Sequence, residues 1–191
     1  MTRPFRRTLL WMITAEEAKR IAARLLADEL PRRWAHTQGV AARVRRLASI
    51  LGEQAELVEV AGFLHDIGYS SEVRSTGFHP LDGARYLRDV LGADVVVCGL
   101  VAHHTGAMVE AEERGIDGLA AEFAPPRQDL LEALTYCDLT ADVNGCHVDV
   151  EERLNEILSR YPREHVVHRS VVRSEPFLRT AAGNVERRLS A

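Results

Sequence analysis

The amino-acid sequence predicts an all-α protein, a bundle of helices around one core. Apolar residues recur every three or four positions along most of the 191 residues, which is the spacing of helices with one buried face. Prolines and glycines stand where these segments begin and end, as they do at the two ends of helices. No set of partner strands is apparent. Together these observations favour helices throughout.

The first part of the chain predicts three helices in succession. Thr14 and Glu17 have the three-residue spacing of a capping box, which places the start of the first helix at Thr14. Pro31 ends that helix and begins the next segment, whose apolar positions run over about residues 33–51. A third helix is expected over about residues 54–67. A glycine follows each of the last two segments as a stop signal.

The middle of the chain alternates loops and helices. Residues 69–78 are polar and predict a loop. Pro80 then begins a helix that ends at Gly92. Residues 94–104 are apolar enough for a buried helix; their valine run alone would also fit a strand, but the helical neighbours favour a helix. Residues 106–127 contain three glycines and a Pro-Pro pair, which predicts a loop or lid with at most short helical pieces.

The remaining helices are expected over about residues 129–142, 149–160 and 164–189, and Pro176 is expected to interrupt the last. The length of the chain predicts one domain, or one domain with a small appendage. We expect the following organisation: an N-terminal extension over residues 1–13, a metal-binding helical domain over residues 14–145, and C-terminal helices packed on that domain over residues 146–191.

Composition narrows the class of protein. Hydrophobic residues make up 46% and charged residues 27% of the chain, as in ordinary soluble globular proteins. The net charge of -4 gives no electrostatic reason to expect a nucleic-acid partner. No apolar run approaches the ~18 residues that a membrane span needs. The basic N-terminus lacks the apolar length and cleavage site of a signal peptide, so we expect a cytoplasmic protein.

The cysteines are Cys98, Cys137 and Cys146. Their odd number and the absence of CxxC spacing argue against a disulfide framework. We expect buried thiols in a reducing compartment.

An ordered series of histidines and aspartates carries the chemistry of this chain. Its members are His36, His65, Asp66, His79, His103, His104 and Asp138. Neutral imidazole and carboxylate are the ligands of hydrolytic Zn, Mn or Fe sites. Asp66 follows an apolar helix and Asp138 lies within one, where a carboxylate is costly unless it is paired or bound to metal. A single histidine on a helix is usually structural, so the prediction of one or two metal ions depends on the whole series.

The order H…HD…D over about residues 33–142 resembles the HD superfamily of metal-dependent phosphohydrolases. The resemblance implies a helical bundle with the metal site at its centre. It also implies that a first ion is bound by His36, His65, Asp66 and Asp138.

Two further segments resemble those of dinuclear members of the family. HPLDGARYL, which begins at His79, and VAHHTG, which ends just after Thr105, are similar to segments of bacterial symmetrical diadenosine-tetraphosphate hydrolases. That likeness implies His79 and His104 as ligands of a second ion, bridged to the first by Asp66. Dinuclear cyclic-dinucleotide phosphodiesterases use both histidines of a similar pair, so His103 remains a candidate.

The sequence departs from both groups, which leaves the substrate open. TYCDLTAD replaces the last motif of the tetraphosphate hydrolases, and the GYP element of cyclic-di-GMP phosphodiesterases is absent after the histidine pair. The bound ions are equally open among Fe, Mn, Zn, Co and Ni, because histidine and aspartate suit all of them.

The resemblance implies hydrolysis of a phosphate ester or anhydride, of a nucleotide or related small molecule, by metal-activated water with His65 and Asp66 at the catalytic centre. The candidate substrate-binding residues are Arg43, Arg85, Arg88 and Thr105. Asp142 lies one helical turn after Asp138 and is a candidate for orienting a ligand.

Two alternatives to a phosphohydrolase remain open. One is an HD-type dinuclear-iron oxygenase, which uses a similar ligand set. The other is a non-catalytic, ligand-binding HD protein. We expect a small phosphorylated molecule as partner, and neither a nucleic acid nor a membrane; the sequence does not predict the oligomeric state. The histidines outside the series, His147, His165 and His168, are assigned no role.

Overall fold

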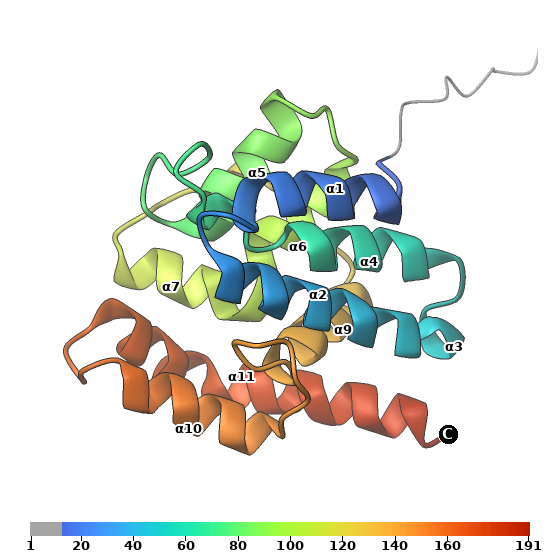
Figure 1. Cartoon of the computed structure of the whole chain (residues 1–191). Coiled ribbons are helices and arrows are strands. Elements are labelled where there is room, and N and C mark those ends of the chain that lie inside the picture. Colours follow the sequence, from blue (N-terminus) through green and yellow to red (C-terminus); the bar gives the residue numbers. More distant parts are fainter. Residues whose placement is uncertain (1–12) are drawn as a thin grey trace, which may run out of the picture.

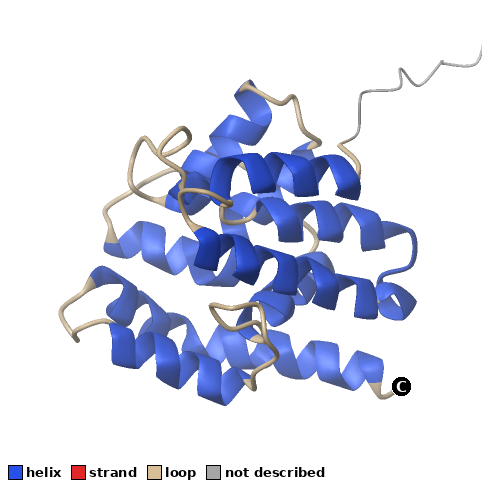
Figure 2. Cartoon of the chain, in the orientation of Figure 1, coloured by secondary structure: helices blue, strands red, loops and turns tan. Residues whose placement is uncertain are grey.

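The computed structural model describes residues 13–191, and helices are its only extended secondary structure (Figure 2). Within these residues the only β pairing is one isolated bridge between Ala141 and His147. The expected all-α class is therefore confirmed. The predicted N-terminal extension falls, but for Ile13, outside the described residues.

Helices of very different length follow one another along the chain (Figure 1). The α-helices are α1 (Ala15–Leu26), α2 (Pro31–Arg46), α3 (Ala48–Leu51), α4 (Ala55–Leu64), α5 (His79–Asp89), α6 (Val95–His103), α7 (Ala107–Glu113), α8 (Leu119–Glu122), α9 (Gln128–Leu139), α10 (Val150–Arg160) and α11 (Val166–Leu189). Short 3-10 helices are η1 (Gly52–Gln54), η2 (Ile67–Tyr69) and η3 (His104–Gly106).

Helices α1 and α2 begin at the residues that the sequence predicts. The Thr14 hydroxyl accepts a hydrogen bond from the backbone N–H of Glu17, and the backbone N–H of Thr14 donates to the Glu17 carboxylate. This reciprocal pair satisfies two backbone donors that would otherwise lack partners at the start of α1. Pro31 is the first residue of α2, where its missing N–H costs nothing.

Helix α4 lies at the centre of the bundle. Its sequence, AELVEVAGFL, is apolar on nearly every side, which is typical of a helix covered all round. It packs against α1, α2, α6 and α9, and Val58, Ala61 and Leu64 are fully buried there (Figure 1). The end of α4 is consequently in the interior, and the residues that follow it enter the core.

The last two helices pack on the rest of the bundle through α9. Helix α11 lies against both α7 and α9, and α10 packs on α9 and α11 (Figure 1). Leu139 of α9, Leu154 of α10 and Leu178 of α11 form a second, smaller apolar cluster at this junction.

Pro176 does not interrupt the last helix, contrary to the expectation from sequence: α11 is continuous from Val166 to Leu189. Pro176 lies on the exposed side of α11, and Val172, whose carbonyl loses its helical partner, is 49% exposed. Water can bond that carbonyl, and the buried Leu178 and Ala181 hold the second half of the helix against the core.

Two other expectations need adjustment. The helix predicted over about residues 33–51 is divided, because α2 ends at Arg46 and Leu47 leaves helical geometry (φ −90°, ψ 5°) before α3. Cys146 is exposed, whereas Cys98 and Cys137 are buried as predicted. Cys146 lies in a turn between α9 and α10, where no neighbouring helix covers it.

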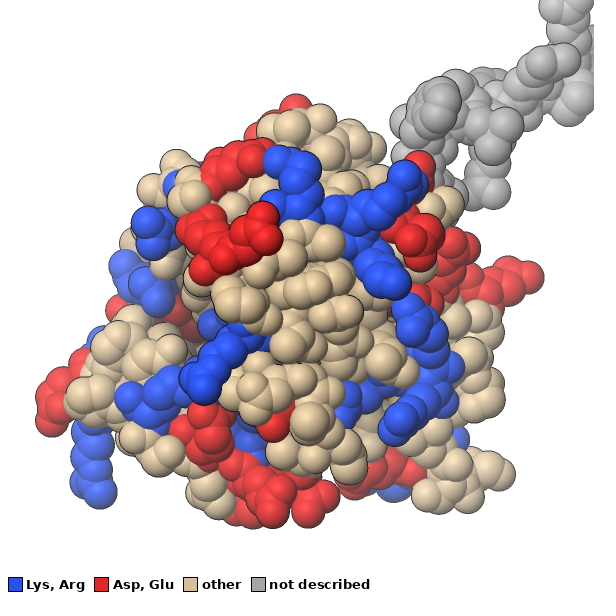
Figure 3. All heavy atoms as spheres, viewed as in Figure 1, with Lys and Arg blue, Asp and Glu red and all other residues tan. Residues whose placement is uncertain are grey.

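The described surface is mixed in charge. Arg24 pairs with Glu72, Arg45 with Glu59, and basic and acidic side chains are interspersed over the face drawn in Figure 3. None of the helices between residues 13 and 191 combines the length and apolar character needed to cross a bilayer.

Candidate metal centre

Six of the seven residues in the histidine–aspartate series meet in the interior, from five parts of the fold. They are His36 of α2, His65 and Asp66 after α4, His79 at the start of α5, His104 of η3 and Asp138 of α9. All are buried except His79, whose side chain is 14% exposed. The buried end of α4 explains this meeting, because it delivers two of the six directly into the space between α2, α5 and α9.

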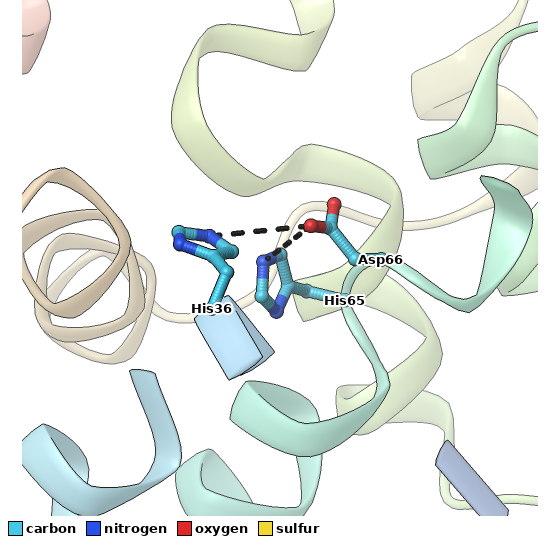
Figure 4. Close-up of side chains that lie close together, drawn as sticks. All are labelled: His36, His65 and Asp66. Atoms are coloured by element: carbon cyan, nitrogen blue, oxygen red, sulfur yellow. Dashed lines mark ion pairs between the residues drawn. The ribbon is translucent and has the colours of Figure 1, made fainter. Parts of the chain in front are cut away.

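The side chains turn their polar ends toward one another. His36 Nε2 lies 2.9 Å from Asp138 Oδ1, and His65 Nε2 lies 3.3 Å from Asp66 Oδ2. Figure 4 shows the Asp66 carboxylate facing the imidazoles of both His36 and His65. On the other side of the same carboxylate, Oδ1 lies 3.4 Å from His79 Nε2, which is 3.2 Å from His104 Nε2.

Three of the four imidazoles are held by the backbone at the nitrogen facing away from the cluster. Nδ1 of His36 donates to the carbonyl of Asp142, Nδ1 of His65 to that of Gly62, and Nδ1 of His104 to that of Val101. A carbonyl can only accept, so Nδ1 carries a proton in each ring, and a ring that loses its Nε2 proton to bind a metal ion turns the Nε2 lone pair toward the cluster. Hydrogen bonds of this kind orient histidine ligands in metal sites.

These donors fit a metal ion. Two ligand atoms that bind one ion at right angles, each at about 2.1 Å, lie about 3.0 Å apart. The separations of 2.9–3.4 Å between the paired atoms are close to that value. Moreover, His65 Nε2 is buried with no hydrogen-bond partner among the described residues, although buried polar atoms nearly always have one.

The two carboxylates are ionised in this environment. Burial alone would raise the pKa of Asp66, but the Arg33 guanidinium, whose Nη1 lies 2.8 Å from Asp66 Oδ2, and His65 hold it well below its usual range. For Asp138, burial is likewise outweighed by the hydrogen bond from His36 and by the nearby His65, so its pKa is also lowered. Both residues therefore offer anionic ligands near neutral pH.

Three of the four imidazoles fall into two groups by the direction of their pKa shift. Burial lowers the pKa of His79 well below its ordinary value and also lowers that of His104, so both rings are neutral. Burial acts in the same direction on His65, but the charges of Asp66 and Asp138 outweigh it and raise the pKa of His65 to about 9. Without a metal ion, His65 is therefore protonated near neutral pH, and its positive charge lies beside the two carboxylates.

Thr105 contacts the cluster by a hydrogen bond to Asp138. Its hydroxyl donates to Asp138 Oδ2 at 2.5 Å, while Oδ1 faces His36. Thr105 has a left-handed backbone (φ 45°, ψ 48°), which is uncommon for a β-branched residue and marks local strain. The sequence-based expectation of a substrate contact becomes, in the structure, a contact with a candidate ligand.

Close backbone packing holds the cluster together. A Cβ on Gly68 would lie 2.1 Å from the carbonyl oxygen of His79, so only glycine lets η2 approach the start of α5 this closely. Likewise, Gly39 of α2 abuts Gly145, which keeps the turn containing Asp142 against α2. Asp142 does orient a candidate ligand there, but through its backbone carbonyl; its carboxylate accepts from the backbone N–H groups of Asn144 and Cys146.

The structure does not bring the other predicted residues into the cluster. His103 faces away, and its Nε2 donates to the carbonyl of Phe123. Arg43 is buried and donates to the carbonyls of Gly39 and Gly145. Arg85 and Arg88 both pair with Glu122 at the surface. Of the paired histidines, the geometry favours His104 as the ligand, and it gives none of these three arginines a contact with the cluster.

Sequence reasoning missed Arg33 and Tyr69. Arg33 reaches Asp66 and also lies with its guanidinium carbon 4.0 Å from the centre of the Tyr69 ring. The other side of that network is His79, whose ring stacks on Tyr69 with centroids 4.0 Å apart. The position of Arg33, three residues before His36 on one helix face, was the available signal.

A cavity adjoins the cluster at His36. Its volume is about 470 Å³, within the range of roughly 300–1,000 Å³ usual for small-molecule sites. Arg32, Arg33 and His36 of α2 line it, together with Arg153 and Arg160 of α10. The cluster therefore borders a space large enough for a small ligand.

Comparisons with known proteins agree with this geometry. The model of the HD domain family matches residues 33–140, more than half of the chain. The chain is similar to Ribonuclease Y of Clostridium novyi (strain NT), with 31% identity over 102 residues, and to Ribonuclease Y of Streptococcus sanguinis (strain SK36), with 37% identity over 93 residues.

The similarity to these curated relatives is partial. The two matches cover 51% and 46% of this chain but 20% and 17% of the relatives, so the chain spans about a fifth of their length or less. No solved structure matches the chain. The match over residues 33–140 includes His36, the His65–Asp66 pair and Asp138, and the fold places these residues together in the core of a helical bundle. The chain belongs to the HD domain family.

Proposed function

We propose that this chain is a metal-dependent phosphohydrolase, which uses activated water to cleave a phosphate ester or anhydride of a nucleotide or related small molecule. The observation that carries the proposal is the convergence of four imidazoles and two carboxylates on one buried space beside a cavity. Membership of the HD family supports it, because most of that family are metal-dependent phosphohydrolases.

The candidate ligands form two sets that share Asp66. In the proposal, His36, His65, Asp66 and Asp138 hold a first divalent ion, and Asp66, His79 and His104 hold a second. Bound there, such ions supply Lewis acidity, which activates water for attack on phosphorus and neutralises charge on the phosphate. Fe, Mn, Zn, Co and Ni all suit this ligand set.

Arg33 is the residue of this chain best placed to receive the phosphate. It lines the cavity, and its guanidinium lies beside Asp66 at the border of the cluster. A guanidinium binds two phosphate oxygens through parallel N–H groups and keeps its charge at any pH relevant to the cell. Tyr69 stacks against both Arg33 and His79 and so fixes the position of each.

The first test is the metal content of the purified protein, measured by elemental mass spectrometry without chelators or an affinity tag that binds metal. About two equivalents per chain would support two ions, and about one would support a single ion. We expect Asp66→Ala to lose the metal, because it removes the carboxylate common to both sets, and His79→Ala to lose about one equivalent. His168→Ala is the matched control, since within residues 13–191 the His168 side chain bonds only the carbonyls of Leu158 and Tyr161. Equal metal content in wild type and Asp66→Ala would refute the proposed centre.

The second test is turnover. Wild type and Asp66→Ala are compared on dinucleoside polyphosphates, nucleoside monophosphates and phosphodiesters, by release of phosphate or nucleotide. Activity in the wild type that Asp66→Ala abolishes supports a phosphohydrolase. Oxygen uptake is measured in parallel, because oxygen consumption with a pair of bound irons and no phosphate release would instead identify an oxygenase.

A further inference from the structure

The cavity beside the candidate metal centre has a wall that lies outside the HD match. The beginning of α2 contributes Arg33 and His36, whereas α10 contributes Arg153, Glu156 and Arg160. The HD match ends at residue 140, and α10 follows it in the chain. Figure 1 shows α10 (orange) below the first turns of α2 (blue). The chemistry of this wall therefore belongs to this chain's own C-terminal helices.

Arg153 is unusual among the arginines of this wall because it is buried and incompletely bonded. Its side chain is 8% exposed. Nη1 donates to Glu156 Oε2 at 2.6 Å, but Nε is buried without a partner, and Nη2 makes no hydrogen bond within residues 13–191. Nε and Nη2 form one edge of the guanidinium, with two parallel N–H groups spaced to meet the two oxygens of a phosphate or carboxylate.

The charges around the cavity favour an anion. Four arginines line it against two glutamates. Glu29 is engaged by the backbone N–H and hydroxyl of Ser71. Glu156 is shared, since its Oε2 accepts from Arg153 while its Oε1 accepts from Arg160. No acidic side chain among the described residues is bonded to the Nε–Nη2 edge of Arg153, so this cavity-lining guanidinium keeps an edge without an anionic partner.

We propose that Arg153 determines substrate specificity by binding a second oxyanion of the substrate through its Nε–Nη2 edge, while the phosphoryl group to be cleaved lies at the metal centre. The inference rests on the proposed phosphohydrolase function and deepens it. The preferred substrate is a small phosphorylated molecule with two separate oxyanions, either two phosphoryl groups or one phosphoryl and one carboxylate. Arg153 binds and positions the substrate and takes no part in the proton transfers.

The kinetic test compares wild type with Arg153→Gln, Arg153→Lys and the control Arg127→Gln, whose arginine pairs with Asp129 on the exposed surface. The substrates are p-nitrophenyl phosphate, with one oxyanion, and a nucleoside 3′,5′-bisphosphate and phosphoglycolate, with two. We expect Arg153→Gln to raise KM by about tenfold or more for the two-oxyanion substrates, the effect of losing one charged bidentate contact. We expect kcat to change much less than KM, because the contact is the same in ground and transition states. The KM of the one-oxyanion substrate should rise less, because that substrate has no second oxyanion for Arg153 to bind.

Arg153→Lys and the melting temperature of each variant distinguish loss of a substrate contact from a disturbed α10. Lysine keeps the positive charge but lacks two parallel N–H donors, so Arg153→Lys should raise the KM of the two-oxyanion substrates less than Arg153→Gln does. A variant that merely loosened α10 would impair the one-oxyanion and two-oxyanion substrates alike and would also lower Tm. An equal loss on all substrates, or an unchanged KM for the two-oxyanion substrates, overturns the proposal. Comparison of the KM effects for the bisphosphate and for phosphoglycolate shows whether Arg153 prefers a second phosphoryl group or a carboxylate.

A binding measurement separates this proposal from the proposed function. Inorganic phosphate, pyrophosphate and phosphonoacetate are titrated into the same proteins by calorimetry. We expect wild type to bind the two-oxyanion probes more tightly than phosphate, and Arg153→Gln to lose that preference by about tenfold. If the preference depends on Arg153 but no phosphate compound is hydrolysed, the anion site stands and the phosphohydrolase proposal fails. If hydrolysis occurs but the preference is absent, or is the same in Arg153→Gln, the Arg153 proposal alone fails.

Discussion

At the scale of single residues, the neighbouring His103 and His104 direct their side chains to different parts of the interior. Helix α6 ends at His103, and His104 has an extended backbone (φ −58°, ψ 149°) that turns its ring in a new direction. His104 then faces His79, whereas His103 bonds the carbonyl of Phe123. A pair of identical neighbours therefore provides an internal comparison for the candidate centre.

We expect His104→Ala to lose about one metal equivalent per chain and His103→Ala to lose none. The reason is that only His104 directs its Nε2 toward other candidate ligands. Elemental analysis of the two variants, prepared in parallel, measures the difference. Loss of metal from His103→Ala with retention in His104→Ala would reverse the assignment of the pair.

The cysteines predict a simple pattern of reactivity. Burial raises the pKa of Cys98 to about 11 and raises that of Cys137 further, so both are protonated thiols near neutral pH. Cys146 is exposed. Iodoacetamide at about pH 8 should therefore add one group to the native protein and three after denaturation, as read by intact mass. The native adduct should vanish in Cys146→Ser, and rapid triple labelling of the native protein would contradict the burial of the other two.

The sequence could identify the histidines and aspartates of the site but not its arginines. A buried aspartate such as Asp138 needs a partner, so its presence in an apolar helix is informative by itself. Arginines are abundant here and usually lie at surfaces, so apart from the position of Arg33 one helical turn before His36, nothing local distinguishes Arg33 or Arg153 from Arg85 or Arg88. Tertiary packing decides which guanidinium borders the cavity, and it places Arg85 and Arg88 against Glu122 and away from the cluster. Their role in substrate binding stays a prediction.

At the scale of elements, the contact between η2 and α5 determines whether Asp66 and His79 meet. Gly68→Ala should lower the free energy of unfolding by about 2 kcal/mol or more, because its Cβ would overlap the His79 carbonyl. It should also reduce metal content, since the added carbon displaces the start of α5. Urea denaturation and elemental analysis measure the two effects.

Gly183→Ala is the matched control for Gly68→Ala. Gly183 lies within α11, and an added Cβ there meets only the end of the Arg187 side chain, at 3.4 Å. Alanine favours helix over glycine by about 0.5–1 kcal/mol, so this variant should be slightly stabilised with unchanged metal content. Equal behaviour of the two alanine variants would mean that the η2–α5 contact is not required.

The positions of the helices were predictable from apolar spacing. Whether a helix breaks at a particular residue, such as Pro176 or Leu47, was not. Pro176 is compatible with α11 because its side of the helix is exposed and the buried Leu178 continues the core face. That exposure depends on where α9 and α7 pack, which no local pattern contains. The bend at Leu47 has no comparable signal, since Leu47 is buried and belongs to the same apolar series as Val40 and Val44.

At the scale of the whole molecule, the buried charges predict how stability depends on pH. The folded pKa values of Asp66 and Asp138 are depressed, so the stability that they contribute is present above their ordinary pKa and is lost as pH falls below about 4. His79 and His104 also have lowered pKa values. The unfolded chain therefore takes up protons first, and stability begins to fall below about pH 6.5.

His65 acts in the opposite direction. Its pKa is raised to about 9, so its contribution is complete below about pH 6.5 and is lost as pH rises through about 9. We expect the metal-free protein to be most stable near neutral pH and to lose stability on both sides. Urea denaturation in EDTA at about pH 4, 7 and 9 tests this. Undiminished stability at about pH 4 would contradict the charge distribution described for the cluster.

The all-α class and the central position of α4 follow from the sequence because helix periodicity and an almost wholly apolar segment are local properties. The position of α10 at the same cavity as the beginning of α2 does not, since these segments are more than a hundred residues apart in the chain. Helices α10 and α11 do pack on the rest of the bundle, but the division of the chain into an extension, a metal-binding domain and C-terminal helices at residues 13 and 145 stays a prediction.

The wide separation of the candidate ligands along the chain has a consequence for biosynthesis. His36 emerges from the ribosome early, but its two fixed partners, Asp138 and the carbonyl of Asp142, are made about a hundred residues later. A growing chain therefore lacks the complete set proposed for the first ion until α9, which carries Asp138, and the turn after it have left the exit tunnel. We therefore expect the first ion to bind at this complete set only after nearly three quarters of the chain has been synthesised.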